Sequence, residues 1–227
     1  MTDDDVKEAR ARATALRNSL PQSVNVAALG VREKAPFQLL CTREALIWRT
    51  EELARTACDA LEREDFAAAA LLSRGTVESA ALSWKLMEVL ENRQRLSPQE
   101  LNDTLMRMLV GSRLWPDRPQ ALQILSCIDR MDKKVPGVRK SYDILSEIAH
   151  PNWRGVFGMY SRTDEPNFTA HFGRGLRPTE GTKSAIVNTL LDALGLFEFS
   201  YNRISEAMPG FLAELESIWP EEKSATD

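Results

Sequence analysis

The sequence is poor in the residues from which metal centres and disulfide frameworks are built. It contains only two histidines and three cysteines, and Cys41, Cys58 and Cys127 share no Cys-x-x-Cys spacing. Three cysteines cannot all pair with one another, and two histidines exclude most multi-histidine metal sites. We therefore expect no disulfide framework, no metal site and no cofactor.

Long apolar runs and a signal peptide are also missing. No run of about 18 apolar residues is present, and the first ten residues are acidic and polar. The 227 residues carry 29 basic and 33 acidic side chains, which gives a net charge of −4. An acidic chain is not built for broad attraction to nucleic acid or anionic lipid, although a local basic patch is compatible with it. We expect a cytoplasmic protein without membrane association.

Helical periodicity dominates the chain, and segments with proline and glycine interrupt it. The clearest helix start is Ser97-Pro98-Gln99-Glu100, a capping box with proline at the first helical position. Apolar residues on both sides of a polar turn at 163–167 predict a small β-hairpin, with strands at 156–160 and 168–172. About seven helices are expected at residues 3–19, 36–64, 66–93, 98–110, 120–134, 138–149 and 179–207, followed by a short one at 211–219. The fold class is mainly α, a helical bundle with one small β-hairpin insertion.

The predicted organisation has one large helical domain. Residues 1–35 form an N-terminal helix and a linker, and residues 36–220 form the domain, with the hairpin inserted at about 155–174. Residues 221–227 form a polar tail.

The segment 138–154 carries the most informative polar pattern. At about 100° per residue, its apolar side chains fall on one arc of a helix, and the polar side chains of Arg139, Asp143, Ser146, Glu147 and His150 fall on the other. Pro151 ends the helix near His150, where the negative end of the helix dipole favours the cationic form of histidine. The polar row is either a solvated face or a site in which His150 acts as a general acid or holds a phosphate. The candidate ligand-binding residues are Arg139, Asp143, Ser146, Asn152 and Arg154.

A second candidate is the pair Arg74 and Glu78, one turn apart in an alanine-rich helix. The small neighbouring side chains let another helix approach closely, so we expect the pair at a seam between helices. One interpretation is a structural ion pair that fixes the register of the helices. The other is a cationic anion-binding site, in which Arg74 faces His150 across a cleft.

Together these residues resemble a motif of known proteins. An Arg-x-x-x-Glu followed by Tyr-x-x-x-Ser-x-x-x-His-Pro is similar to bacterial helical proteins of the HEPN-like superfamily, over about residues 66–172. The matching positions are Arg74, Glu78, Tyr142, Ser146, His150 and Pro151. The resemblance implies a helical bundle, often dimeric. Many such proteins are ribonucleases or toxin and phage-defence components, and others are not catalytic.

The sequence departs from the nuclease signature of that superfamily, in which an arginine precedes a histidine with four to six residues between them. Those positions before His150 hold Asp143, Ile144 and Leu145. The missing cation would have to come from Arg74 or Arg154.

The sequence thus supports two hypotheses. In the first, a polar cleft binds an anionic ligand, with RNA or a nucleotide as the leading candidate. If the cleft is catalytic, His150, Arg74 and Glu78 are the candidate catalytic residues, with His150 as the general acid or base. In the second, the protein is a non-catalytic helical module that pairs with itself, as a homodimer, or with a protein partner.

Overall fold

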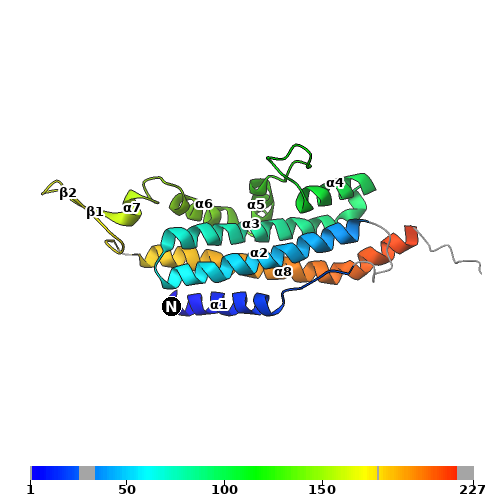
Figure 1. The fold of residues 1–227 in the computed structure, drawn as a ribbon, viewed down its shortest axis with the longest axis horizontal. Coiled ribbons are helices and arrows are strands. Elements are labelled where there is room, and N and C mark those ends of the chain that lie inside the picture. Colours follow the sequence, from blue (N-terminus) through cyan, green and yellow to red (C-terminus); the bar gives the residue numbers. More distant parts are fainter. Residues whose placement is uncertain (1, 26–33, 178, 219–227) are drawn as a thin grey trace, which may run out of the picture.

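The computed structural model describes residues 2–25, 34–177 and 179–218, and in these ranges it is a mainly helical bundle with one two-stranded sheet (Figure 1). The helices are α1 (Thr2–Asn18), α2 (Lys34–Glu62), α3 (Phe66–Glu91), a short 3-10 helix (Arg93–Arg95), α4 (Pro98–Leu109), α5 (Ile124–Asp132), α6 (Val138–Ala149), α7 (Phe157–Tyr160) and α8 (Glu180–Ile218). The strands are β1 (Ser161–Asp164) and β2 (Thr169–Phe172), which pair antiparallel. The predicted fold class is confirmed.

Helix α3 is the centre of the bundle. It packs against α2 and α8 along its length, and the shorter α5 and α6 pack on it as well (Figure 1). Its small residues Ala69, Ala70, Ala80 and Ala81 are fully buried. Small side chains at these contacts allow the long helices to approach closely, and larger side chains such as Phe197 fill the core between them.

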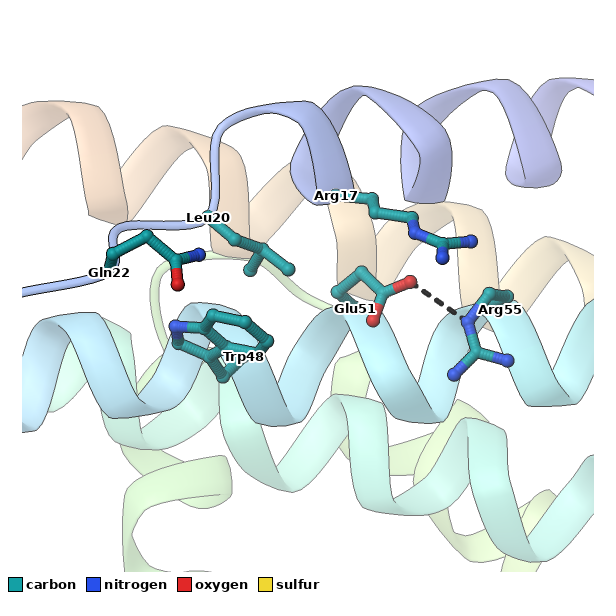
Figure 2. Close-up of a pocket in the computed structure, with 6 residues that line it drawn as sticks. All are labelled: Arg17, Leu20, Gln22, Trp48, Glu51 and Arg55. Atoms are coloured by element: carbon teal, nitrogen blue, oxygen red, sulfur yellow. Dashed lines mark hydrogen bonds and ion pairs between the residues drawn. The ribbon is translucent and has the colours of Figure 1, made fainter.

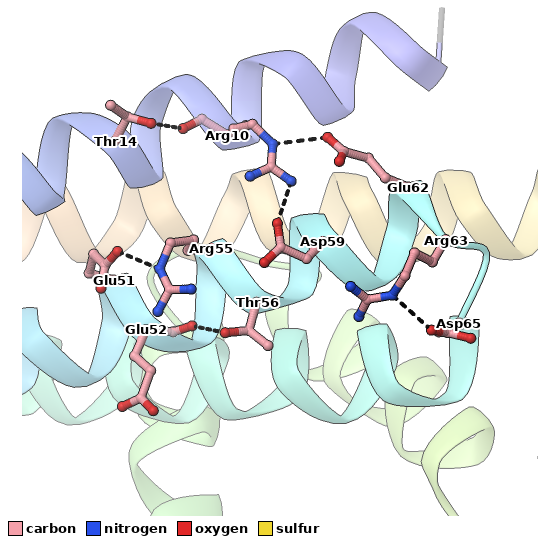
Figure 3. Close-up of polar contacts among 10 residues, drawn as sticks. All are labelled: Arg10, Thr14, Glu51, Glu52, Arg55, Thr56, Asp59, Glu62, Arg63 and Asp65. Atoms are coloured by element: carbon pink, nitrogen blue, oxygen red, sulfur yellow. Dashed lines mark hydrogen bonds and ion pairs between the residues drawn. The ribbon is translucent and has the colours of Figure 1, made fainter.

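Helix α1 lies along α2 and α8, so the N-terminal helix belongs to the same core as the rest of the bundle. Its apolar face, which includes Val6 and Leu16, is buried. On the polar side, the guanidinium group of Arg10 donates to Asp59 at 2.7 Å and to Glu62 at 2.9 Å (Figure 3). These ion pairs fix α1 against the second half of α2.

Local signals located several boundaries correctly. At the start of α4, the Ser97 hydroxyl accepts from the backbone N–H of Glu100, and the Glu100 carboxylate accepts from the backbone N–H of Ser97. The predicted capping box is therefore confirmed. Helix α6 ends at Ala149, as Pro151 predicts.

The prediction of two separate C-terminal helices was wrong, because α8 continues through Pro209. Pro209 is exposed, so the hydrogen bond that it cannot make lies on the solvent side of the helix. The flanking side chains of Met208 and Phe211 are buried, and Arg93 donates to Glu214 at 2.7 Å. Packing on both sides of the proline therefore keeps the helix continuous.

The predicted hairpin exists, but the prediction of its first strand at 156–160 was wrong, because the strand lies at 161–164. Residues 157–160 form the single helical turn α7, closed by the backbone bonds from Gly158 to Trp153 and from Tyr160 to Val156. The strands are limited to 161–164 and 169–172. Helix α5 also begins later than predicted, at residue 124, because Ser112 forms a backbone bridge with Gln120 that keeps this stretch extended.

All three cysteines are free thiols. Burial raises the pKa of Cys58 to about 11, and burial also raises the pKa of Cys41 and of Cys127. In the described ranges no helix is both long and apolar enough to cross a membrane. The predicted tail at 221–227, and residues 26–33 of the predicted N-terminal helix and linker at 1–35, lie outside the described residues.

Candidate functional site

Arg74 and Glu78 lie where α3 packs against α6, together with Tyr142 of α6. The Nε of Arg74 donates to the Tyr142 hydroxyl at 2.9 Å, and this hydroxyl donates to Oε1 of Glu78 at 2.9 Å. The direct distance from Arg74 Nε to Glu78 Oε1 is 3.4 Å, and both side chains are 27% exposed. The two predicted residues therefore lie at a seam between helices, and Tyr142 bridges them.

The electrostatics of this cluster keep the tyrosine neutral. Burial raises the pKa of Tyr142, and its hydrogen bond to Glu78 adds to the rise while Arg74 opposes it. The phenol is therefore a hydrogen-bond donor at neutral pH. One positive and one negative charge compensate each other here, so the cluster suits the register of α3 and α6 better than the capture of an anion.

We expect Tyr142→Phe to lower the free energy of unfolding by about 1–2 kcal/mol, because it leaves partly buried groups of Arg74 and Glu78 with one partner fewer. Urea denaturation at pH 7 measures the change. Tyr160→Phe is the control, because Tyr160 is exposed and its hydroxyl has no hydrogen bond within the described ranges. Equal stability of wild type and Tyr142→Phe would contradict a structural role of the cluster.

His150 lies at the C-terminal end of α6 and its side chain is exposed. It is about 12 Å further along the helix axis than Tyr142, and in the described part of the chain no hydrogen bond or ion pair joins it to Arg74. Ser146, between them, donates its hydroxyl back to the carbonyl of Tyr142 at 2.9 Å. These contacts therefore do not bring Arg74 opposite His150, and they do not form the cleft that was predicted between the two residues.

Arg139 and Asp143 form a surface ion cluster with Asp129. Arg139 donates to Asp129 at 2.6 Å and to Asp143 at 3.0 Å, and these hydrogen bonds raise the pKa of Arg139. A shallow cavity of about 610 Å³ brings both residues together with Arg154. Its lining also includes Lys140 and the acidic residues Asp132 and Glu147, so positive and negative charges balance. This cavity does not favour an anion.

Asn152 organises the turn that follows α6. Its side-chain Nδ2 donates to Glu147 at 2.7 Å, and its Oδ1 accepts from the backbone N–H of Gly155 at 3.0 Å. Arg154, by contrast, makes no hydrogen bond or ion pair with any residue that the structure describes. Of the candidate ligand-binding residues, Arg154 therefore has the free cationic group.

The structure adds a feature that the sequence patterns did not single out as a site, which we call the arm (residues 150–177). The arm consists of the turn after α6, α7, the hairpin and the start of the return to α8, and it extends beyond the end of the long helices (Figure 1). Four aromatic side chains on it are exposed: Trp153 at 67%, Tyr160 at 38%, Phe168 at 98% and Phe172 at 73%. The clustering of aromatic residues with arginines at 153–174 is the signal that could have identified it.

Phe168 has a backbone conformation that is rare for a bulky residue. Its φ angle is +49°, in the left-handed region, and it lies in the turn between β1 and β2. A phenylalanine that is almost fully exposed gains no burial energy to offset that conformation. Strained backbone conformations of this kind occur preferentially at functional sites.

The arm also carries the local positive charge that the whole chain lacks. It contains four arginines and two acidic residues. Arg174 pairs with Asp65, and Arg177 donates to the carbonyl of Ser161 at 2.8 Å. Arg162 lies directly opposite His171 in the hairpin, and both are exposed. Neither side chain forms a hydrogen bond or ion pair within the described ranges.

Comparison of the chain with family models, with curated protein sequences and with solved structures finds no match. The HEPN-like resemblance stays a prediction.

Proposed function

We propose that the protein binds single-stranded RNA through the arm. The observation that carries this proposal is the set of four exposed aromatic side chains, interleaved with the unpaired Arg154 and Arg162, on a segment that projects from the bundle. Proteins bind single-stranded nucleic acid by stacking bases on aromatic rings and by following the backbone with positive groups. The net charge of −4 opposes binding elsewhere on the surface, so the arm is the favoured place of contact.

The order of the residues along the arm fits this function. Successive residues of a strand point to opposite faces, so Arg162 and His171 share one face of the hairpin and Phe172 lies on the other. Phe168 lies at the tip. A strand of RNA that passes over the tip would meet a ring and a cation within a few residues of each other.

The test is a titration of a fluorescently labelled single-stranded RNA of about 12 nucleotides, followed by anisotropy at several salt concentrations. We expect saturable binding that weakens as salt rises, because Arg154 and Arg162 displace counterions from the phosphates. Absence of binding at about 50 mM salt would contradict the proposal.

The same proposal extends to His150 as the acid–base residue of an RNA cleavage step, with Arg154 stabilising charge on the phosphate. His150 and Arg154 lie on the same turn at the base of the arm. After incubation with the protein, intact RNA is separated from cleavage products. Wild type and His150→Ala are compared in the presence and in the absence of a chelator. Cleavage that needs His150 and ignores the chelator supports this role.

A second candidate function is homodimerisation, and apolar surface outside the arm favours it. A groove of about 640 Å³ runs along α8 between α1 and α6, with Leu191 and Leu196 on its wall. One turn beyond Gly195 on the same face, Phe199 is half exposed and stacks on Trp84 at 5.6 Å between ring centroids. This face would pair with the same face of a second copy.

We expect Phe199→Ser to shift the protein from dimer towards monomer, because it removes the largest exposed apolar group of this face. Sedimentation velocity over a range of protein concentrations measures the change, with Phe37→Ser as the control, since Phe37 is equally exposed but lies on α2. A wild-type protein that stays monomeric would count against dimerisation.

A further inference from the structure

A separate cavity of about 400 Å³ lies between α1 and α2, away from the arm (Figure 2). Six residues line it: Arg17, Leu20, Gln22, Trp48, Glu51 and Arg55. Arg17 lies in the last turn of α1, and Leu20 and Gln22 lie in the segment that follows this helix. The other three lie on successive turns of one face of α2. The volume is in the range of small-molecule sites, which is about 300–1,000 Å³.

The flat ring of Trp48 lines one end of the cavity. Trp48 is 44% exposed, and its ring is held in place because Nε1 donates to the carbonyl of Pro21 at 2.9 Å. Leu20 points toward this ring, and the Gln22 amide lies beside it (Figure 2). A ring fixed in this way can stack on a planar ligand with little loss of conformational entropy.

The other end of the cavity is cationic. Arg55 donates from Nε to Glu51 at 2.9 Å, and the Glu51 side chain is only 7% exposed. The Arg17 side chain extends over Glu51 towards Arg55 (Figure 2). The guanidinium group of Arg17 makes no hydrogen bond or ion pair in the described ranges. The lining therefore holds two guanidinium groups and one carboxylate, which pairs with Arg55, and this leaves an excess positive charge and free N–H donors on Arg17.

We propose that this cavity binds a planar organic anion. The ring of the ligand stacks on Trp48, and its carboxylate or phosphate accepts hydrogen bonds from Arg17 and Arg55. Guanidinium groups suit this task because their N–H donors match the oxygens of either anion. The inference uses no residue of the arm, so it stands or falls independently of RNA binding.

Isothermal titration calorimetry with three probes tests the site. The first two are 2-naphthoate and adenosine monophosphate. Both have a planar ring and an anionic group, which is a carboxylate in the first and a phosphate in the second. The third is 2-naphthalenemethanol, a neutral analogue. We expect saturable binding of at least one anion below about 1 mM, and about tenfold weaker binding of the neutral analogue. Binding of naphthoate alone identifies a carboxylate ligand, and binding of the nucleotide alone identifies a phosphate ligand.

Variants show whether the binding uses this cavity. Arg17→Gln is expected to weaken binding of the anion about tenfold, because it removes a charge-assisted hydrogen bond. Arg113→Gln is the matched control, since it removes an exposed arginine outside the cavity and should leave the affinity unchanged. Trp48→Leu keeps an apolar contact for Leu20 but removes the stacking surface, so it should also weaken binding about tenfold.

Two results would overturn the proposal. One is the absence of saturable binding of both anions at about 1 mM. The other is unchanged affinity in Arg17→Gln. Because Arg17 is exposed, this variant is expected to fold even if Trp48→Leu does not.

Discussion

The double variant Phe168→Ala, Phe172→Ala is expected to bind single-stranded RNA about 100-fold more weakly than wild type, because each stacked base contributes about 1–3 kcal/mol. Both side chains are more than 70% exposed and so contribute little to the core: Phe168 is 98% and Phe172 is 73% exposed. The thermal unfolding midpoint should therefore stay unchanged. Phe37→Ala is the control, as an exposed phenylalanine on α2.

The aromatic and the cationic contributions can be separated by salt. Arg162→Ala removes one phosphate contact, so the slope of log affinity against log salt should fall by about 1. The double phenylalanine variant should lower the affinity at every salt concentration and leave the slope unchanged. If the double variant binds as tightly as wild type, the arm is not the RNA-binding surface.

The sequence predicted those parts of the fold that depend on nearby residues. Ser97 and Glu100 make their capping box within one turn, and Pro151 ends α6 without help from other elements. The break expected at Pro209 failed because distant side chains decide it. Met208 and Phe211 are buried against other helices, and that packing outweighs a local preference.

In the candidate site, too, the features set by nearby residues were predicted and those set by distant packing were not. The i,i+4 spacing of Arg74 and Glu78 predicted an ion pair at a seam, and the pair exists. The bridging role of Tyr142 depends on how α3 and α6 cross, which no local pattern encodes. The polar row at 138–154 likewise predicted a common face, but it did not reveal that Asp129 and Asp143 already neutralise Arg139.

The sequence did not predict the exposed arm, because its residues have the pattern of an ordinary hairpin. Alternating apolar positions in a strand normally mean that one face is buried. Here the hairpin leaves the bundle, so Phe172 and Phe168 stay exposed. Only the placement of the strands in space distinguishes these two cases.

Gly155 lies in the turn at the base of the arm, and Gly155→Ala is expected to lower the free energy of unfolding by about 3 kcal/mol. The residue is buried in the turn after α6. A Cβ atom there would lie 2.6 Å from the carbonyl oxygen of Ile148, and it would also overlap that of His150. Both are backbone atoms at the end of a helix, so neither can rotate away as a flexible side chain would.

Gly181→Ala is the matched control for Gly155→Ala, because a Cβ at Gly181, in the first turn of α8, meets no atom of the described residues within 4 Å apart from the backbone of its own helix. It should leave the stability unchanged or raise it slightly, since alanine favours the helix. Urea denaturation of both variants, followed by the RNA titration, separates two effects. A loss of stability in Gly155→Ala but not in Gly181→Ala means that the strain lies in the turn.

The RNA titration is made without urea, where the bundle is still folded. Weaker RNA binding by Gly155→Ala under this condition means that binding depends on the direction in which this turn points the arm. If Gly155→Ala is as stable as wild type, the turn is free to relax and does not fix the arm.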